Sequence, residues 1–184
     1  MENMIEIEYK TLLSFEEYRR TRDVYSSYAP ILQANTYFDT PTRSLFHHGI
    51  SLRIRTIKDS HTLTIKFPHG EHVEEWSESV ATCTVQELNH PLIYTHIAPF
   101  LSEEINCLGT LLTSRIIIPY RKGILCLDEN TYLNRVDYEL EYELMEGYSE
   151  DNEGYQGILQ QLEIEEKKAK GKFFRFIQLL DNDI

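Results

Sequence analysis

The N-terminal segment 5–10, Ile-Glu-Ile-Glu-Tyr-Lys, alternates apolar and charged residues and constrains the fold more than any other part of the chain. A period of two indicates a β-strand, because successive side chains of a strand point to opposite faces of a sheet. The charged face can be an ordinary solvated surface. Alternatively, two carboxylates and an ammonium in one line can serve a metal ion and a phosphate together. The residues on this face are Glu6, Glu8 and Lys10.

The length and charge of the chain limit its organisation and its partners. A chain of 184 residues is long enough for one domain with a sizeable core, so we predict a single domain over residues 1–184. Thirty acidic against 18 basic residues give a net charge of −12. Nucleic acid and anionic membranes should repel such a chain. Any polyanion that binds here needs a local basic pocket.

The cysteines and the N-terminus indicate the compartment. Three cysteines without a CxxC spacing suit a reducing environment better than a disulfide framework. The N-terminus enters the first charged strand without an apolar leader, and no run approaches 18 apolar residues. We therefore predict a cytoplasmic protein with no membrane partner. Both a monomer and a homodimer remain open.

The pattern along the chain predicts an α+β fold with antiparallel strands. Ser14 with Glu17, and Thr84 with Glu87, have the spacing of helix capping boxes. Short polar turns connect most strands, and eight antiparallel strands can close into a barrel. The expected strands are 5–10, 35–39, 50–57, 61–67, 71–80, 108–120, 123–129 and 132–145. The expected helical segments are 14–26, 43–48 (a short helix or turn), 84–101, 153–168 and 173–180.

Most of the later strands repeat the same design, with charge on one face and apolar residues on the other. On strand 71–80 we favour Glu75 over Glu74 for the charged face, because Glu75 then shares that face with two serines while Trp76 joins the apolar face. The other residues on charged faces are Arg53, Arg55, Lys66, Arg115, Asp128, Asp137, Glu139, Glu141 and Glu143.

Two arrangements fit this pattern. The charged faces can lie outside in water, or the helices can cover the apolar faces so that the charged faces line a central tunnel. A run of like charge on one strand is repulsive unless an ion of opposite sign lies against it. A tunnel holding both signs would suit a metal-bound polyphosphate, because Arg and Lys bind phosphate oxygens and carboxylates bind hard divalent cations.

The charged motifs, taken in their order along the chain, resemble those of a known family. The sequence Glu6-Ile7-Glu8-Tyr9-Lys10 is similar to the ExExK signature of the CYTH, or triphosphate tunnel metalloenzyme, family. The chain looks most like the small single-domain bacterial members that are often described as adenylate-cyclase-like. The motifs that follow in the family's order are Arg53-x-Arg55, Thr64-Ile65-Lys66, Arg115, Asp128, Glu139-x-Glu141 and Lys172. Thr113 is a departure, because several members have a basic residue there.

The resemblance implies a fold, a cofactor and roles for named residues. It implies an eight-stranded antiparallel tunnel with a charged interior and helices outside, a divalent cation (Mg²⁺ or Mn²⁺), and small-molecule substrates that bear a triphosphate. Glu6, Glu8, Glu139 and Glu141 would be metal ligands, with Asp128 as a further acidic catalytic residue. Lys10, Arg53, Arg55, Lys66, Arg115 and Lys172 would hold the triphosphate, and Glu75 and Arg175 are weaker candidates.

Three functions remain open from the sequence. A metal-dependent triphosphatase acting on inorganic, thiamine or nucleoside triphosphate is the leading hypothesis, by attack of a metal-oriented water on the terminal phosphorus. A class IV-type adenylate cyclase would need the same triphosphate-binding residues, so these residues do not distinguish it from a triphosphatase. No residue in the sequence indicates a purine pocket. A non-catalytic polyphosphate or nucleotide binder would keep the basic residues without turnover.

Overall fold

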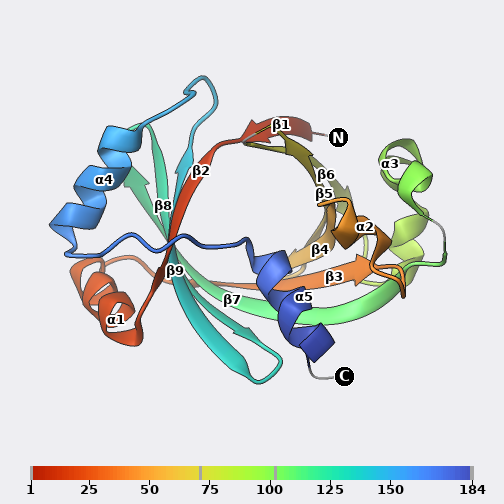
Figure 1. The fold of residues 1–184 in the computed structure, drawn as a ribbon, viewed down its shortest axis with the longest axis horizontal. Helices are drawn as coiled ribbons and strands as arrows, with labels where there is room; N and C mark the ends of the chain where they lie inside the picture. The colour runs from red at the N-terminus through yellow and green to blue at the C-terminus, as the bar shows by residue number, and fades with distance from the viewer. Residues whose placement is uncertain (1, 71, 102, 183–184) are drawn as a thin grey trace.

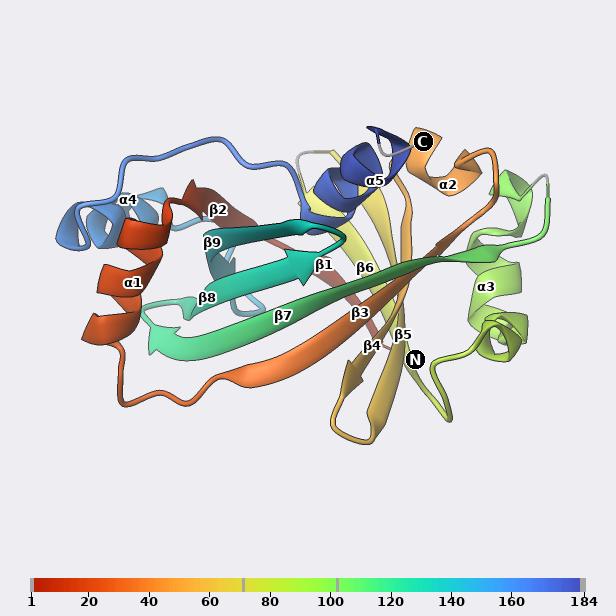
Figure 2. The ribbon, with the colours of Figure 1, turned by 90° about the horizontal axis from the view of Figure 1, so that it is seen from below.

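The computed structural model describes residues 2–70, 72–101 and 103–182. Over these residues nine strands form one antiparallel sheet, which curls into a nearly closed barrel with helices around it, as the α+β prediction required (Figures 1 and 2). The order of the strands is β1-β6-β5-β4-β3-β7-β8-β9-β2. Their bounds are β1 Glu2–Glu6, β2 Glu8–Leu13, β3 Ile31–Asp39, β4 Ser51–Ile57, β5 Ser60–His69, β6 His72–Val80, β7 Asn106–Tyr120, β8 Gly123–Tyr132 and β9 Arg135–Leu144.

The N-terminal segment forms two strands rather than the single one that we predicted, which raises the count from eight to nine. β1 pairs with β6 and β2 pairs with β9, so the two edges of the sheet belong to consecutive strands. Ile7 joins them, and its carbonyl accepts a hydrogen bond from the Leu144 amide at 2.9 Å. The segment therefore bends at Ile7 and closes the barrel (Figure 1).

Several strand boundaries differ from the sequence prediction. β3 begins earlier, and β8 continues to Tyr132, where the prediction had already begun the next strand. Only two residues, Leu133 and Asn134, separate β8 from β9, and Leu133 adopts a left-handed conformation with φ of 49°. Glu71, the predicted start of β6, lies outside the described residues.

Most of the helices are shorter than the sequence pattern suggested, whereas α5 is slightly longer than the predicted 173–180. Ser14 and Glu17 form the predicted capping box of α1. Thr84 makes no such cap; instead, Glu87 accepts hydrogen bonds from the amide and hydroxyl of Thr82 at 3.1 and 3.0 Å. The stretch that follows breaks into three short helices. The bounds are α1 Phe15–Val24, α2 Ser44–His47, η1 Val85–Asn89, α3 Pro91–His96, η2 Ala98–Phe100, α4 Asn152–Gln161 and α5 Lys172–Asn182.

Two apolar clusters cover the outside of the barrel. α1 and α4 pack on β7, β8 and β9, with Tyr18 and Ile158 among the buried contacts. α2, η1 and α3 cover β4 and β5, with Leu45 and Ile93 buried. β1 is less well covered: Ile5, on the apolar face of this strand, is 44% exposed.

Helix α5 packs differently from the other helices. Its buried residues Phe176 and Ile177 contact Tyr37, Leu111 and Tyr132, forming a third apolar cluster. Tyr37 pairs with Arg53 across β3 and β4, so these two side chains share a face of the sheet. α5 therefore lies against inward-facing residues, whereas the prediction placed every helix outside.

Within the described residues no helix is long and apolar enough to cross a membrane.

Candidate functional site

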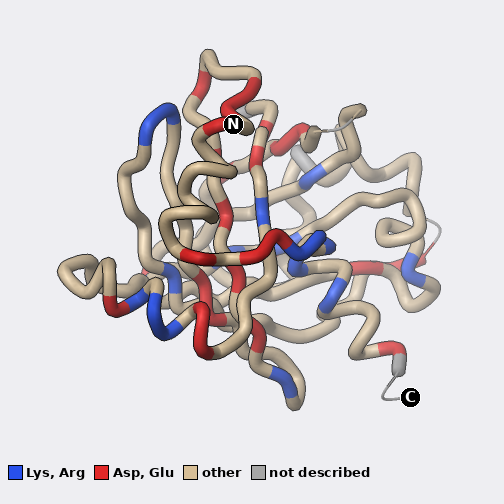
Figure 3. The backbone as a smooth tube through the Cα atoms, turned by 60° about the vertical axis from the view of Figure 1, so that its left-hand side comes forward, with Lys and Arg blue, Asp and Glu red and all other residues tan. Residues whose placement is uncertain are grey.

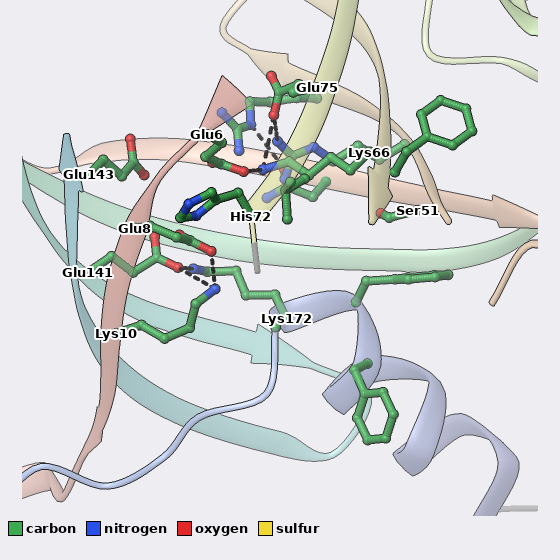
Figure 4. Close-up of a pocket in the computed structure, with 18 of the residues that line it drawn as sticks. Glu6, Glu8, Lys10, Ser51, Lys66, His72, Glu75, Glu141, Glu143 and Lys172 are labelled. Atoms are coloured by element: carbon green, nitrogen blue, oxygen red, sulfur yellow. Dashed lines mark hydrogen bonds and ion pairs between the residues drawn. The ribbon is translucent and has the colours of Figure 1, made fainter. Parts of the chain in front are cut away.

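The charged faces of the strands surround a cavity of about 580 Å³ inside the barrel. This confirms the tunnel alternative over the solvated-face alternative. All six basic residues predicted to hold the triphosphate line the cavity, from the four strands β2, β4, β5 and β7 and from the start of α5. Figure 4 shows Lys10, Lys66 and Lys172 among the lining side chains, and Figure 3 shows how basic and acidic residues are distributed along the backbone. The charged lining residues are Lys10, Arg53, Arg55, Lys66, Arg115, Lys172, Glu6, Glu8, Glu75, Glu141 and Glu143.

Two arginines on β4 form the least compensated positive charge of the site. Arg53 is 7% exposed, and its Nε is buried without a hydrogen-bond partner among the described residues. Its nearest carboxylate, Glu75, is 3.9 Å away. Arg55 donates from Nε to Asn35 Oδ1 at 3.1 Å. The charge of Arg53, followed by burial, lowers the pKa of Arg55 to about 10. An anion placed here would relieve this repulsion.

Lys66 on β5 connects to β6, the adjacent strand, and to β1, the strand beyond β6 in the order of the sheet. Its ammonium forms an ion pair with Glu6 on β1 and another with Glu75 on β6, the latter at 2.9 Å (Figure 4). Burial opposes ionisation of Glu75, but the charges of Lys66 and Arg53 outweigh it and lower the pKa of this carboxyl. Glu75, rather than Glu74, is therefore the β6 carboxylate that lines the cavity.

Glu8 is a cavity carboxylate whose pKa is raised. Lys10 forms an ion pair with it, yet burial, the nearby Glu141 and the charge of Glu6 raise the pKa of Glu8 to about 7. Glu6, Glu8 and Glu143 each offer one carboxylate oxygen, and these three oxygens lie within 4.8 Å of one another. Such a group of oxygen ligands fits a hard divalent cation.

A second, more deeply buried acidic group lies behind the cavity wall. Asp128, Glu139 and Glu141 also offer oxygens within 4.8 Å of one another. Arg115 donates two hydrogen bonds to Asp128, at 2.8 and 2.7 Å, and one to Glu141 at 2.5 Å. It also donates to Glu143 at 3.0 Å, so the same arginine connects the two acidic groups.

The C-terminal helix supplies the other cations of this second group. Lys172 lies 2.9 Å from both Asp128 and Glu141 and also pairs with Glu139. Arg175 pairs with Glu139 and with Asp137, at 3.0 Å in each case. Three residues named from the sequence, Asp128, Glu139 and Arg175, are thus not among the cavity-lining residues; they belong to the buried ion network that supports the wall.

The four predicted metal ligands therefore do not form one group. Glu6 and Glu8 lie with Glu143, whereas Glu139 and Glu141 lie with Asp128. Glu143 was missed as a site residue, although the two-residue period of its strand had placed it on the charged face. Thr113 donates to Asn130 Oδ1 at 2.8 Å, so the position noted above as a departure from the family's pattern is a neutral part of the wall.

Comparisons with known proteins agree with this architecture. The profile of the CYTH domain matches residues 4–177. A Bacillus subtilis protein named "Putative triphosphatase YjbK" is 29% identical, over 97% of each chain. A crystal structure from Bacillus halodurans, described as a putative adenylate cyclase, is 31% identical over 96% of this chain and 99% of that one, with a TM-score of 0.84. The fold also matches HpAC1 from Hippeastrum, at 24% identity over 95% of each chain and a TM-score of 0.73.

Proposed function

The chain belongs to the CYTH domain family, and we propose that it is a divalent-metal-dependent hydrolase of triphosphates bound inside the barrel. One observation carries this proposal: the same cavity holds a crowded arginine pair and a group of crowded carboxylates. The charge of Arg53 lowers the pKa of Arg55, and burial, followed by the charge of Glu141, raises the pKa of Glu8; both shifts support a cavity that would accept added counter-charges. A polyphosphate together with a metal cation would supply them.

We assign the basic residues of the cavity different roles in phosphate binding according to their ion-pair partners. Arg53 and Arg55 are free of bidentate carboxylate partners among the described residues, so they are our primary phosphate contacts. Lys66 and Lys10 extend the positive lining on β5 and β2. Arg115 and Lys172 already bind carboxylates, and we assign them to positioning Glu141 as well as to the end of the phosphate chain.

Glu6, Glu8 and Glu143 would hold the metal ion, which supplies charge neutralisation and an activated water when bound. Glu139 and Glu141 remain candidates for a second ion, because together with Asp128 they offer a second group of carboxylate oxygens, which Lys172, Arg115 and Arg175 neutralise when no ion is bound. The basic side chains neutralise the phosphate oxygens and align the terminal phosphorus. The oxygen of water forms the new P–O bond while the bridging P–O bond breaks. Orthophosphate is released, the bridging oxygen leaves with the electron pair of that bond on the shortened phosphate chain, and a proton of the water passes to solvent.

The name of the Bacillus subtilis relative supports a triphosphatase, and that of the Bacillus halodurans relative keeps a cyclase in consideration. Product analysis separates the two activities. We expect inorganic triphosphate, ATP and thiamine triphosphate, each with Mg²⁺ and with Mn²⁺, to yield orthophosphate from at least one substrate. The activity should disappear with a chelator and in Glu6→Gln. Cyclic AMP with diphosphate would establish the cyclase instead, and binding without any product would leave only a polyphosphate binder.

A further inference from the structure

Gln33 is a buried side chain of the cavity wall whose polar group has no partner in the fold. It lies on β3, is only 5% exposed and lines the charged cavity. Its carboxamide forms no hydrogen bond to another of the described residues, and neither of its two amide atoms is sealed from solvent. A buried amide costs free energy unless a ligand or a water molecule binds it. The group is therefore available to whatever occupies the cavity.

The neutral neighbours of Gln33 on the same inner face already have partners. Asn35, two residues further along β3, accepts a hydrogen bond from Arg55 at 3.1 Å. Thr113, directly opposite Gln33 on β7, donates to Asn130 at 2.8 Å. Of these three neutral side chains, Gln33 is the one left for a ligand. The sequence prediction began this strand at residue 35 and therefore assigned Gln33 to no face.

The register of the sheet places Gln33 between two arginines of the cavity. β3 lies between β4 and β7 in the order of the strands. On one side, Arg55 of β4 is opposite Asn35; on the other, Arg115 of β7 is opposite Ile31. Both arginines are therefore diagonal neighbours of Gln33, at about 7 to 8 Å, a separation that long side chains can span. A phosphate held between the two arginines lies over the Gln33 carboxamide.

Arg115 connects this position with the carboxylates that would bind the metal ion. It donates a hydrogen bond at 3.0 Å to Glu143, which belongs to the proposed metal group. Arg55, on the other side of Gln33, belongs to the proposed phosphate contacts. Gln33 therefore lies at the boundary between the phosphate side and the metal side of the cavity. A water molecule activated by the metal attacks phosphorus across this boundary.

The chemistry of a carboxamide suits this boundary better than a further cation would. The amide nitrogen donates two hydrogen bonds, whereas the carbonyl oxygen only accepts them. An ionised phosphate accepts hydrogen bonds and has none to donate, so it can satisfy the amide nitrogen but not the carbonyl oxygen. A water molecule supplies the O–H that the carbonyl needs. A glutamine that orients the attacking water also recurs in other phosphoryl-transfer sites.

We propose that Gln33 orients the attacking water: its Oε1 accepts a hydrogen bond from the water, and its Nε2 donates one to the terminal phosphate. This inference rests on the proposed function for the positions of the phosphates and the metal ion, and it adds a residue that contacts the nucleophile. Gln33 takes up no proton. The oxygen of the water bonds to phosphorus, the bridging oxygen leaves with its electron pair, and the proton of the water passes to solvent.

Two substitutions separate orientation of the water from binding of the phosphate, with inorganic triphosphate and ATP as substrates and Mn²⁺ as the metal. Gln33→Met removes both polar atoms at similar volume, so kcat should fall about 100-fold. The Kd for a non-hydrolysable triphosphate analogue should rise about tenfold at most, because one neutral hydrogen-bonding group is lost. Gln33→Glu keeps an acceptor for the water but repels phosphate. It should therefore retain a higher kcat than Gln33→Met and show a larger rise in Kd.

Gln160→Met, at an exposed position on α4, is the matched control and should change neither kcat nor Kd. Urea denaturation of Gln33→Met should give an unfolding free energy no lower than that of the wild type, because the lost amide has no protein partner. A lower unfolding free energy with an unchanged kcat would make Gln33 a structural residue and overturn the proposal.

The remaining outcomes separate this proposal from the proposed function. A Gln33→Met variant with a raised Kd but a normal kcat would make Gln33 a phosphate contact only, which contradicts the assignment to the water. Wild-type hydrolysis that Gln33→Met retains in full overturns this assignment alone. A wild-type protein that releases no orthophosphate from either substrate overturns the proposed function, and this assignment with it.

Discussion

Arg53 and Arg55 lie on the same inward face of β4, and the charge of Arg53 lowers the pKa of Arg55 to about 10. Directly opposite Arg55 on the adjacent strand β3, the barrel offers Asn35 rather than a carboxylate. A fold that needed these arginines only for stability would pair them with acids, as it pairs Arg115 with Asp128. The incomplete pairing of these two arginines therefore supports our proposal that a ligand anion binds here.

Replacing Arg55 should separate binding from stability. Arg55→Gln removes a charge-assisted contact to phosphate, worth about 1.5 to 3 kcal/mol, so the Kd for triphosphate should rise by roughly one to two orders of magnitude. The free energy of unfolding should not fall, because the substitution relieves repulsion with Arg53. Calorimetry and chemical denaturation measure the two quantities. Arg22→Gln, at an exposed position on α1, is the control.

Replacing Arg115, unlike replacing Arg55, should lower the free energy of unfolding. Arg115→Met leaves the fully buried Asp128 and the nearly buried Glu141 without their main arginine partner. Breaking a buried ion pair from one side costs about 3 to 5 kcal/mol, which urea denaturation would detect. An unfolding free energy equal to that of the wild type would show that Lys172 alone suffices to neutralise the acidic group, and that we have misjudged the role of Arg115.

The inward alternation of the strands could be predicted from the sequence, whereas the pairing of charges could not. The period of two placed Glu6, Glu8 and Glu143 on charged faces, because one-residue steps change the face of a strand. Which carboxylate each cation neutralises depends on strand order and on the position of α5. Lys172 comes from a helix far along the chain. It forms ion pairs with Glu139 and Glu141, which therefore belong to a different charge cluster from Glu6, Glu8 and Glu143.

The closure of the barrel and the position of α5 also required the structure. Ile7 looks like any apolar strand residue, yet the chain bends there and joins both edges of the sheet. The apolar stripe of α5 predicts burial but not the surface that it covers. Phe176 packs 5.4 Å from Tyr37 (between ring centroids), on an inward-facing residue, because the end of a barrel exposes apolar inner positions that a helix can cover.

The metal ligands can be separated by affinity. We expect Glu143→Gln to weaken Mn²⁺ binding as strongly as Glu6→Gln does, by roughly tenfold or more, because each loses one anionic ligand from the same group. Glu139→Gln should weaken binding of the first ion less and should destabilise the fold instead, since Glu139 is fully buried and binds Lys172 and Arg175. Titration by electron paramagnetic resonance would rank the three variants.

The affinity for the metal should depend on pH through Glu8. Because the pKa of this carboxyl is raised from 4.5 to about 7, the folded protein holds a proton between these values that the unfolded chain has lost. Without metal, stability should therefore fall as the pH rises from 4.5 to 7. Below pH 7 a cation must displace this proton, so Mg²⁺ affinity should increase up to about tenfold per pH unit and level off above pH 7. In Glu8→Gln both dependences should be reduced.

Diffraction from crystals grown with Mn²⁺ and a non-hydrolysable triphosphate analogue tests the central claim most directly. We predict an anomalous peak inside the barrel among Glu6, Glu8 and Glu143, with the phosphates of the analogue against Arg53 and Arg55. Manganese bound only on the outer surface, or an analogue bound outside the cavity, would contradict the account.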